Sequence, residues 1–255
     1  MKYLVEVKKV NALVITMLLA GMFLVNSASA YESGTWQNEI TLYGWATGID
    51  GSVEQIDGDG TDITYDTSDI LENLNAIFMG GYQGRFNRWS IMADLIYLDI
   101  SDSGNTNTSV GTASAELGLK SWIVSGAIGY DLVQDNWGIV TVLGGVRYLG
   151  LDTDSSLAVG GNQIVDDSDS SNLTDGIIGL RGHFRLTDSW YIPYHADIGA
   201  GGSDLSYQIF AGIGYRYKWF DVHLGYRYMK YEFEDDQLLQ DLALSGPQLG
   251  LGIVF

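Results

Sequence analysis

The sequence predicts an all-β fold: a transmembrane, antiparallel, up-and-down β-barrel of ten strands. Three observations lead to it. They are an export signal at the N-terminus, alternation of apolar and polar residues with period two, and aromatic residues at both ends of the apolar face. After the export signal, no stretch has the ~18 consecutive apolar residues of a membrane-spanning helix, so strands must form the framework.

Residues 1–30 have the features of a secretory signal peptide. Three lysines precede an apolar run over residues 12–25, and small residues at Ala28 and Ala30 suit signal peptidase. A retained membrane anchor is the alternative, but the apolar run is shorter than the ~20 residues that a spanning helix needs. We therefore predict a cleaved signal peptide followed by one barrel domain over residues 31–255.

Composition excludes several classes of function. The 255 residues include 13 Lys and Arg against 32 Asp and Glu, and a formal charge of −19 repels the phosphates of nucleic acids. The absence of Cys excludes disulfides, thiolate metal sites and a Cys nucleophile, and leaves His183, His195 and His223 as the imidazole groups. We predict no cofactor, no metal centre and no nucleic-acid partner.

The alternation is clearest over residues 190–199, 207–219 and 222–229. In each segment Tyr, Trp, Ile, Leu or Val share one face, while the other face carries Gly and charged residues in mid-strand. A soluble barrel would turn its apolar face inward, but apolar strands with aromatic ends are typical of a surface that faces lipid. Because lipid satisfies no backbone hydrogen bonds, such strands must close into a barrel.

Connections alternate between short and long. Tight turns are expected near residues 87–88, 134–136, 187–189 and 219–220, and longer polar loops near 50–74, 102–112, 152–172, 201–206 and 235–244. The ten expected strands are approximately 36–48, 75–86, 89–101, 115–131, 137–151, 173–186, 190–200, 207–218, 221–233 and 246–255. Eight strands would result if the first long loop displaces a weak strand, and twelve if residues 52–65 form a spanning pair. Short turns would lie in the periplasm and long acidic loops outside the cell.

The last strand carries a candidate assembly signal. Leu249, Leu251, Ile253 and the terminal Phe255 share its lipid-facing side. This pattern resembles the signal that the barrel-assembly machinery of Gram-negative outer membranes recognises. That machinery, outer-membrane lipid and lipopolysaccharide are the predicted partners.

Two further stretches carry a family resemblance. They are LYGW at 42–45 leading into GIDG at 48–51, and FMGGY at 78–82 leading through RWS at 88–90 to DLIYLD at 94–99. Together with the C-terminal strand they resemble the small outer-membrane β-barrel proteins of Gram-negative bacteria and, more narrowly, a group of such barrels of uncharacterised function. The resemblance implies the fold and a location in the bacterial outer membrane. It implies no catalytic residue.

Charged residues on the inward face predict an ion-pair network in the lumen. A turn centred on Asp188 would set Arg181 opposite His195 and diagonal to Asp197, and Arg147 and Asp175 would be neighbours near the outer rim. The predicted network comprises Asp94, Arg147, Asp175, Arg181, His195, Asp197, Arg216 and Arg227. It would narrow or plug the lumen, although the same side chains could line a selective pore.

We predict no catalytic residues, because none of the three histidines falls at the outer rim, where a surface hydrolase would act. The acidic loops could bind divalent cations loosely, but residues 57–62 fail the EF-hand pattern. A short helical turn is expected over residues 67–74. The predicted function is a structural or passive outer-membrane protein, with a small-solute pore, a loop-mediated surface or cation-binding protein, and an outer-membrane hydrolase as alternatives.

Overall fold

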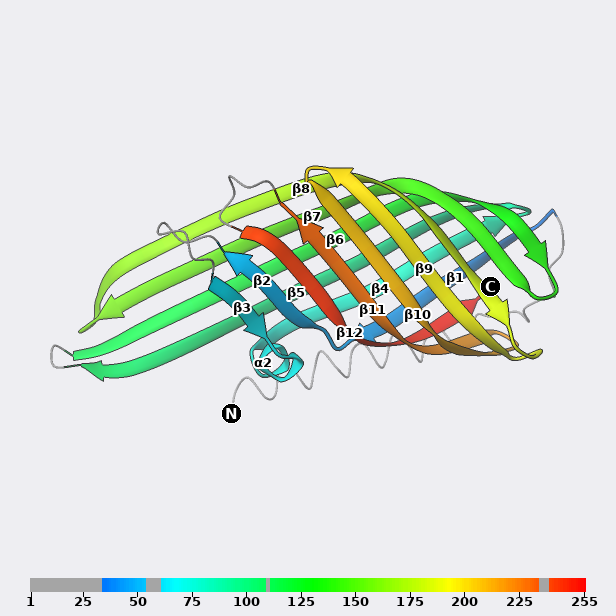
Figure 1. Cartoon of the computed structure of the whole chain (residues 1–255). Helices are drawn as coiled ribbons and strands as arrows, with labels where there is room; N and C mark the ends of the chain where they lie inside the picture. The colour runs from blue at the N-terminus through cyan, green and yellow to red at the C-terminus, as the bar shows by residue number, and fades with distance from the viewer. Residues whose placement is uncertain (1–33, 54–60, 109–110, 234–238) are drawn as a thin grey trace.

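The computed structural model describes residues 34–53, 61–108, 111–233 and 239–255, so the signal-peptide prediction lies outside it. Figure 1 shows its strands wound into one tilted barrel. The elements are β1 (Trp36–Trp45), β2 (Gly48–Val53), β3 (Thr61–Tyr65), α2 (Thr67–Glu72), β4 (Leu74–Phe86), β5 (Trp89–Thr108), β6 (Gly111–Asp135), β7 (Gly138–Val159), β8 (Asn162–Arg185), β9 (Trp190–Gly201), β10 (Leu205–Tyr217), β11 (Phe220–Glu232) and β12 (Leu239–Val254).

The prediction of a closed ten-strand antiparallel barrel is confirmed. Neighbours follow the order β1-β4-β5-β6-β7-β8-β9-β10-β11-β12, and β1 pairs with β12 to close the ring. β2 continues along β12 beyond β1, and β3 folds back on β2. The hairpin of β2 and β3 therefore extends one wall, and the twelve-strand alternative is wrong. The helical turn expected over residues 67–74 is α2.

The outward face is apolar and bounded by two rows of aromatic residues. Ile178 and Ile198 are 59% and 58% exposed, although a soluble protein would bury them. On β5 the rows are marked by Trp89 and Tyr97, about 26 Å apart along the strand at ~3.3 Å per residue. A strand tilt of ~35–45° reduces this span to roughly 20 Å along the barrel axis, a little less than the ~25 Å apolar band of an outer-membrane barrel. No helix in the described residues is long and apolar enough to cross a membrane.

Two of the expected polar loops are strands instead. Residues 102–108 and 111–112 continue the pairing of β5 with β6, and residues 152–172 form a hairpin of β7 and β8 around Gly160 and Gly161. These two hairpins project well past β9 and β10 in Figure 1. Beyond the lipid the strands need no apolar face, so backbone pairing continues through Ser, Thr and Asp residues that the alternation pattern does not detect.

The projecting part of the β7–β8 hairpin is expected to be dispensable for the barrel. Asp154 and Ser168 are register partners, so replacing residues 155–167 by Asn-Gly joins them through a two-residue turn. We expect the free energy of unfolding to change by no more than about 1 kcal/mol, because the deleted part contributes nothing to the buried cluster inside the barrel. Urea unfolding in lipid vesicles measures this, and a loss of several kcal/mol would contradict it.

The hydrophobic core lies inside the barrel, where it forms an apolar plug. Its buried members come from strands around the ring: Trp45, Met79, Ile96, Ile123, Leu149, Met229, Tyr231, Phe233 and Leu244. Met229 and Tyr231 are fully buried, and Leu149 is 1% exposed. The plug lies toward the projecting hairpins, one inward-facing position beyond the charged residues of the lumen.

Candidate functional site in the lumen

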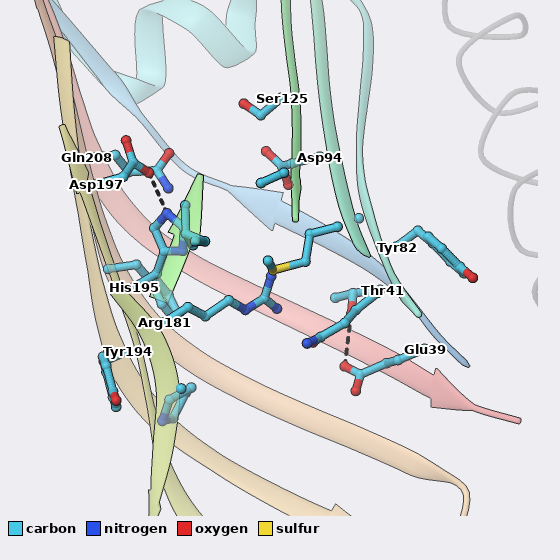
Figure 2. A pocket seen from close by; sticks show the side chains of 18 of the residues that line it. Glu39, Thr41, Tyr82, Asp94, Ser125, Arg181, Tyr194, His195, Asp197 and Gln208 are labelled. Carbon is cyan, nitrogen blue, oxygen red and sulfur yellow. Dashed lines mark hydrogen bonds and ion pairs between the residues drawn. The ribbon is translucent and has the colours of Figure 1, made fainter. Parts of the chain in front are cut away.

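A polar cavity of about 200 Å³ lies between the apolar plug and the short-turn end of the barrel. Inward-facing residues of all ten barrel strands line it, because alternate side chains of each strand point to the axis. Figure 2 shows Arg181 reaching into the cavity from β8, with Glu39 and Thr41 of β1 on the opposite wall. The side chains of Arg216 and Glu39 are 43% and 25% exposed, so solvent enters from the short-turn end, which is the periplasmic end.

Asp197 is the centre of the most buried ion pair. Both of its carboxylate oxygens accept hydrogen bonds from Nη2 of Arg147 at 2.8 Å, and Oδ2 lies 2.5 Å from Nε2 of His195. The side chains of Arg147 and Asp197 are 2% and 0% exposed. Figure 2 marks the contact of His195 with Asp197. This arrangement holds the imidazole against the lumen wall.

Arg227 anchors a second buried cluster. Its Nη2 donates to Asp94 Oδ1 at 3.1 Å and to Gln208 Oε1 at 2.6 Å, and its Nη1 donates to the Tyr43 hydroxyl at 3.0 Å. The Tyr43 hydroxyl in turn donates to Asp94 Oδ2 at 2.8 Å, and the guanidinium lies 4.9 Å from the Trp45 ring. The cluster therefore links the charged layer directly to the apolar plug.

A third cluster surrounds Asp221 near the periplasmic mouth. Asp221 accepts hydrogen bonds from Nε of Arg216 at 3.1 Å and from the Tyr191 hydroxyl, and its Oδ1 lies 3.5 Å from Nδ1 of His223. Glycines make room for the rings. A Cβ on Gly214 would lie 2.2 Å from the Tyr191 ring, so the sequence places glycine directly opposite the tyrosine.

The structure corrects two of the predicted pairings. Arg181 faces His195 in register as expected, but Asp197 binds Arg147 and not Arg181. Arg147 and Asp175 are register partners as expected, and Asp175 lies level with the outer end of β9, although β7 and β8 continue far beyond both residues. Asp175 accepts hydrogen bonds from the turn after β9 instead: the backbone N–H groups of Gly202 and Ser203 and the hydroxyl of Ser203.

Several lumen residues were missed by the sequence prediction. Glu39, Asp131 and Asp221 also face inward, in phase with predicted neighbours, and Arg85 binds Asp131 at 3.1 Å. Glu39 and Asp221 lie close to strand ends and Asp131 lies at a β-bulge, where the alternation of inward and outward residues is hardest to follow. The sequence contains a clearer signal for the apolar plug. An apolar residue follows two positions after each of Tyr43, Asp94, Arg147 and Arg227: Trp45, Ile96, Leu149 and Met229.

The chemistry available in the lumen is that of fixed charges. His195 and His223 each contact a carboxylate, and among the described residues neither ring has a Ser or Thr hydroxyl within hydrogen-bond distance. The described residues contain no group of three or more His, Asp or Glu side chains arranged to hold a metal ion. Asp57 and Asp59 of the expected cation-binding loop lie outside the described part of the chain.

Comparison with solved structures identifies the fold class. No protein-family model and no curated protein matches the sequence. The outer membrane protease OmpT from Escherichia coli superposes with a TM-score of 0.50 at 11% identity, over 89% of this chain and 99% of OmpT. The translocator domain of the autotransporter NalP from Neisseria meningitidis gives 0.46 at 16% identity, over 87% and 89%. The attachment invasion locus protein Ail of Yersinia pestis, solved with a heparin analogue, gives 0.36 at 12% identity, over 86% and 99%.

The fold shared with OmpT is that of an outer-membrane β-barrel. The exposed apolar band and its two aromatic rows give the independent reason for the location, because such a surface is stable only in contact with lipid. The protein is thus an integral barrel of the Gram-negative bacterial outer membrane.

Proposed function

We propose that this protein is a closed, non-conducting outer-membrane barrel with a structural role, which holds a rigid pair of β-hairpins above the membrane. The observation that carries the proposal is the apolar plug. It fills the lumen with side chains from β1, β4, β5, β6, β7, β11 and β12, and its central members are almost completely buried. A solute or hydrated ion crossing this layer would lose its water, and the buried Tyr231 hydroxyl is the one polar side-chain group without a partner that the described plug residues offer in its place.

In this proposal an apolar layer closes the lumen, and the charged residues have another role. The sequence suggested that charges alone would plug it, whereas the apolar layer is the tighter barrier and the charged layer lies on its periplasmic side. The charged residues then serve stability: each of Arg85, Arg147, Arg216 and Arg227 has a carboxylate partner within 4 Å. Ion pairs of this kind join the inward-pointing side chains of different strands and so hold the strands in register around the ring.

A planar bilayer recording tests the closed state. Wild-type protein should give no stable conductance steps, because the plug excludes hydrated ions. Leu149→Ala combined with Met229→Ala removes side chains from the middle of the plug and should open a measurable conductance. The matched control is Ile178→Ala with Ile198→Ala, which shortens two lipid-facing residues and should leave the bilayer silent.

Heat-modifiable migration on gels must first show that each variant is folded, since buried large-to-small changes cost ~2–5 kcal/mol each. A stable wild-type conductance would contradict the closed state and favour the pore.

The outward face and the β1–β12 seam of the barrel support contacts with lipid and with the assembly machinery. The outward face meets outer-membrane lipid, and the acidic strands beyond it stand where lipopolysaccharide and its bridging cations are expected. There Asp152 and Asp154 lie beside Lys120 on paired strands. The seam between β1 and β12 ends in the outward-facing Phe255, which supports recognition of this strand by the barrel-assembly machinery.

A further inference from the structure

In the described part of the chain, Arg181 is the arginine of the lumen cavity that has no carboxylate within 4 Å. Among the described residues it makes no hydrogen bond and no ion pair within 4 Å, whereas Arg85, Arg147, Arg216 and Arg227 all do. Its half-buried side chain reaches toward the middle of the cavity in Figure 2. A partly desolvated guanidinium with no carboxylate within 4 Å is less stable than a paired one, so the site favours an anion beside it.

The nearby carboxylates are already engaged. Asp197, diagonal to Arg181 in the sheet, is held by Arg147 and His195. Asp175, three inward-facing positions farther along β8, accepts three hydrogen bonds from Gly202 and Ser203. Asp94 accepts from Arg227 and Tyr43. Glu39, on the facing wall, pairs with Arg216 at 3.9 Å and accepts a hydrogen bond from the Thr41 hydroxyl. These acids thus have other donors, and none of them lies within 4 Å of the Arg181 guanidinium in the described residues.

The rest of the cavity fits a small oxyanion. Gln83 of β4 lines the same space, and its side chain has no hydrogen-bond partner among the described residues. Met92, Ala127, Leu143 and Ile177 form an apolar wall, which strengthens a charge-assisted hydrogen bond by excluding water. The plug closes the outer side and Arg216 is exposed at the mouth, so a ligand enters from the periplasm.

We propose that Arg181, with Gln83, forms a binding site for a small oxyanion, a phosphate or a carboxylate, reached from the periplasmic side. The fork of guanidinium N–H donors matches the two oxygens of either group. Anion binding goes beyond the closed-barrel role, and only access from the periplasmic side alone rests on the plug.

Titration calorimetry tests the site on the full barrel in a neutral maltoside detergent. Sodium phosphate and sodium acetate are titrated separately at matched ionic strength, and the anion that binds more tightly identifies the class. Arg181→Gln removes the charge at similar length and should weaken binding at least ~10-fold. Arg181→Lys should retain weaker binding, and Arg185→Gln, at an exposed position near the periplasmic end, should bind like wild type.

Stability in anion-free buffer provides the second readout. Arg181→Gln should be at least as stable as wild type there, because it removes an unpaired cation, and it should lose the thermal stabilisation that the bound anion gives wild type. Absence of binding by both anions at millimolar concentration would overturn the proposal. Equal binding by Arg181→Gln, or a marked loss of stability of that variant without anion, would overturn it as well.

Discussion

Replacing Asp197 by Ala is expected to destabilise the barrel by ~3–5 kcal/mol, because the variant leaves a buried guanidinium without its partner. Arg147 is 1% exposed and both Asp197 oxygens accept hydrogen bonds from its Nη2. His195 would lose its carboxylate contact in the same variant. Urea unfolding in lipid vesicles, followed by tryptophan fluorescence, gives the free energy.

Two further variants separate the ion pair from a general effect of mutation. Arg147→Met combined with Asp197→Ala should be less destabilised than the sum of the single variants, because neither charge is then left unpaired. Asp241→Asn breaks the partly exposed pair between Lys230 and Asp241 and should cost no more than ~1 kcal/mol. If Asp197→Ala lowers the free energy of unfolding as little as Asp241→Asn does, the lumen is too well hydrated for the Arg147–Asp197 ion pair to stabilise the barrel.

Deleting Phe255 is expected to prevent assembly of the barrel in the cell. The backbone N–H and C=O of Phe255 exchange hydrogen bonds of 2.9 Å with Asn38, at the seam where β12 closes on β1. Its ring lies outward, 51% exposed, in the periplasmic aromatic row. The deletion removes the ring from the proposed recognition signal and also shortens the seam. Cell fractionation should show unfolded protein in the periplasm and no heat-modifiable band in the outer membrane.

The control for assembly keeps the aromatic ring: Phe255→Trp should insert normally. Ile253→Asp places a charge on the lipid-facing side of the same strand, where it costs at most ~2–4 kcal/mol near the midplane and less near the interface. It should therefore reduce assembly less than the deletion. Normal insertion of the Phe255 deletion would contradict the assembly signal.

Local patterns were enough to predict the barrel itself. Alternation with period two depends only on which way successive side chains point, so it identified the ten strands and the face that meets lipid. The same alternation placed Arg181 opposite His195, since antiparallel register follows from the position of the turn. It failed at residues 152–172, where both faces of the strands meet water and no apolar face remains.

The partners inside the lumen were decided by tertiary structure. Arg147 on β7 binds Asp197 on β9, and Arg85 on β4 binds Asp131 on β6, so each pair skips the strand between. Tilted strands bring inward-pointing side chains together across the axis, and long arginines reach past their register neighbours. Alternation in the sequence indicated most of the residues that face the lumen, but it missed Glu39, Asp131 and Asp221. Which of these charges meet depends on the closed barrel, in which Arg181 has no carboxylate within 4 Å among the described residues.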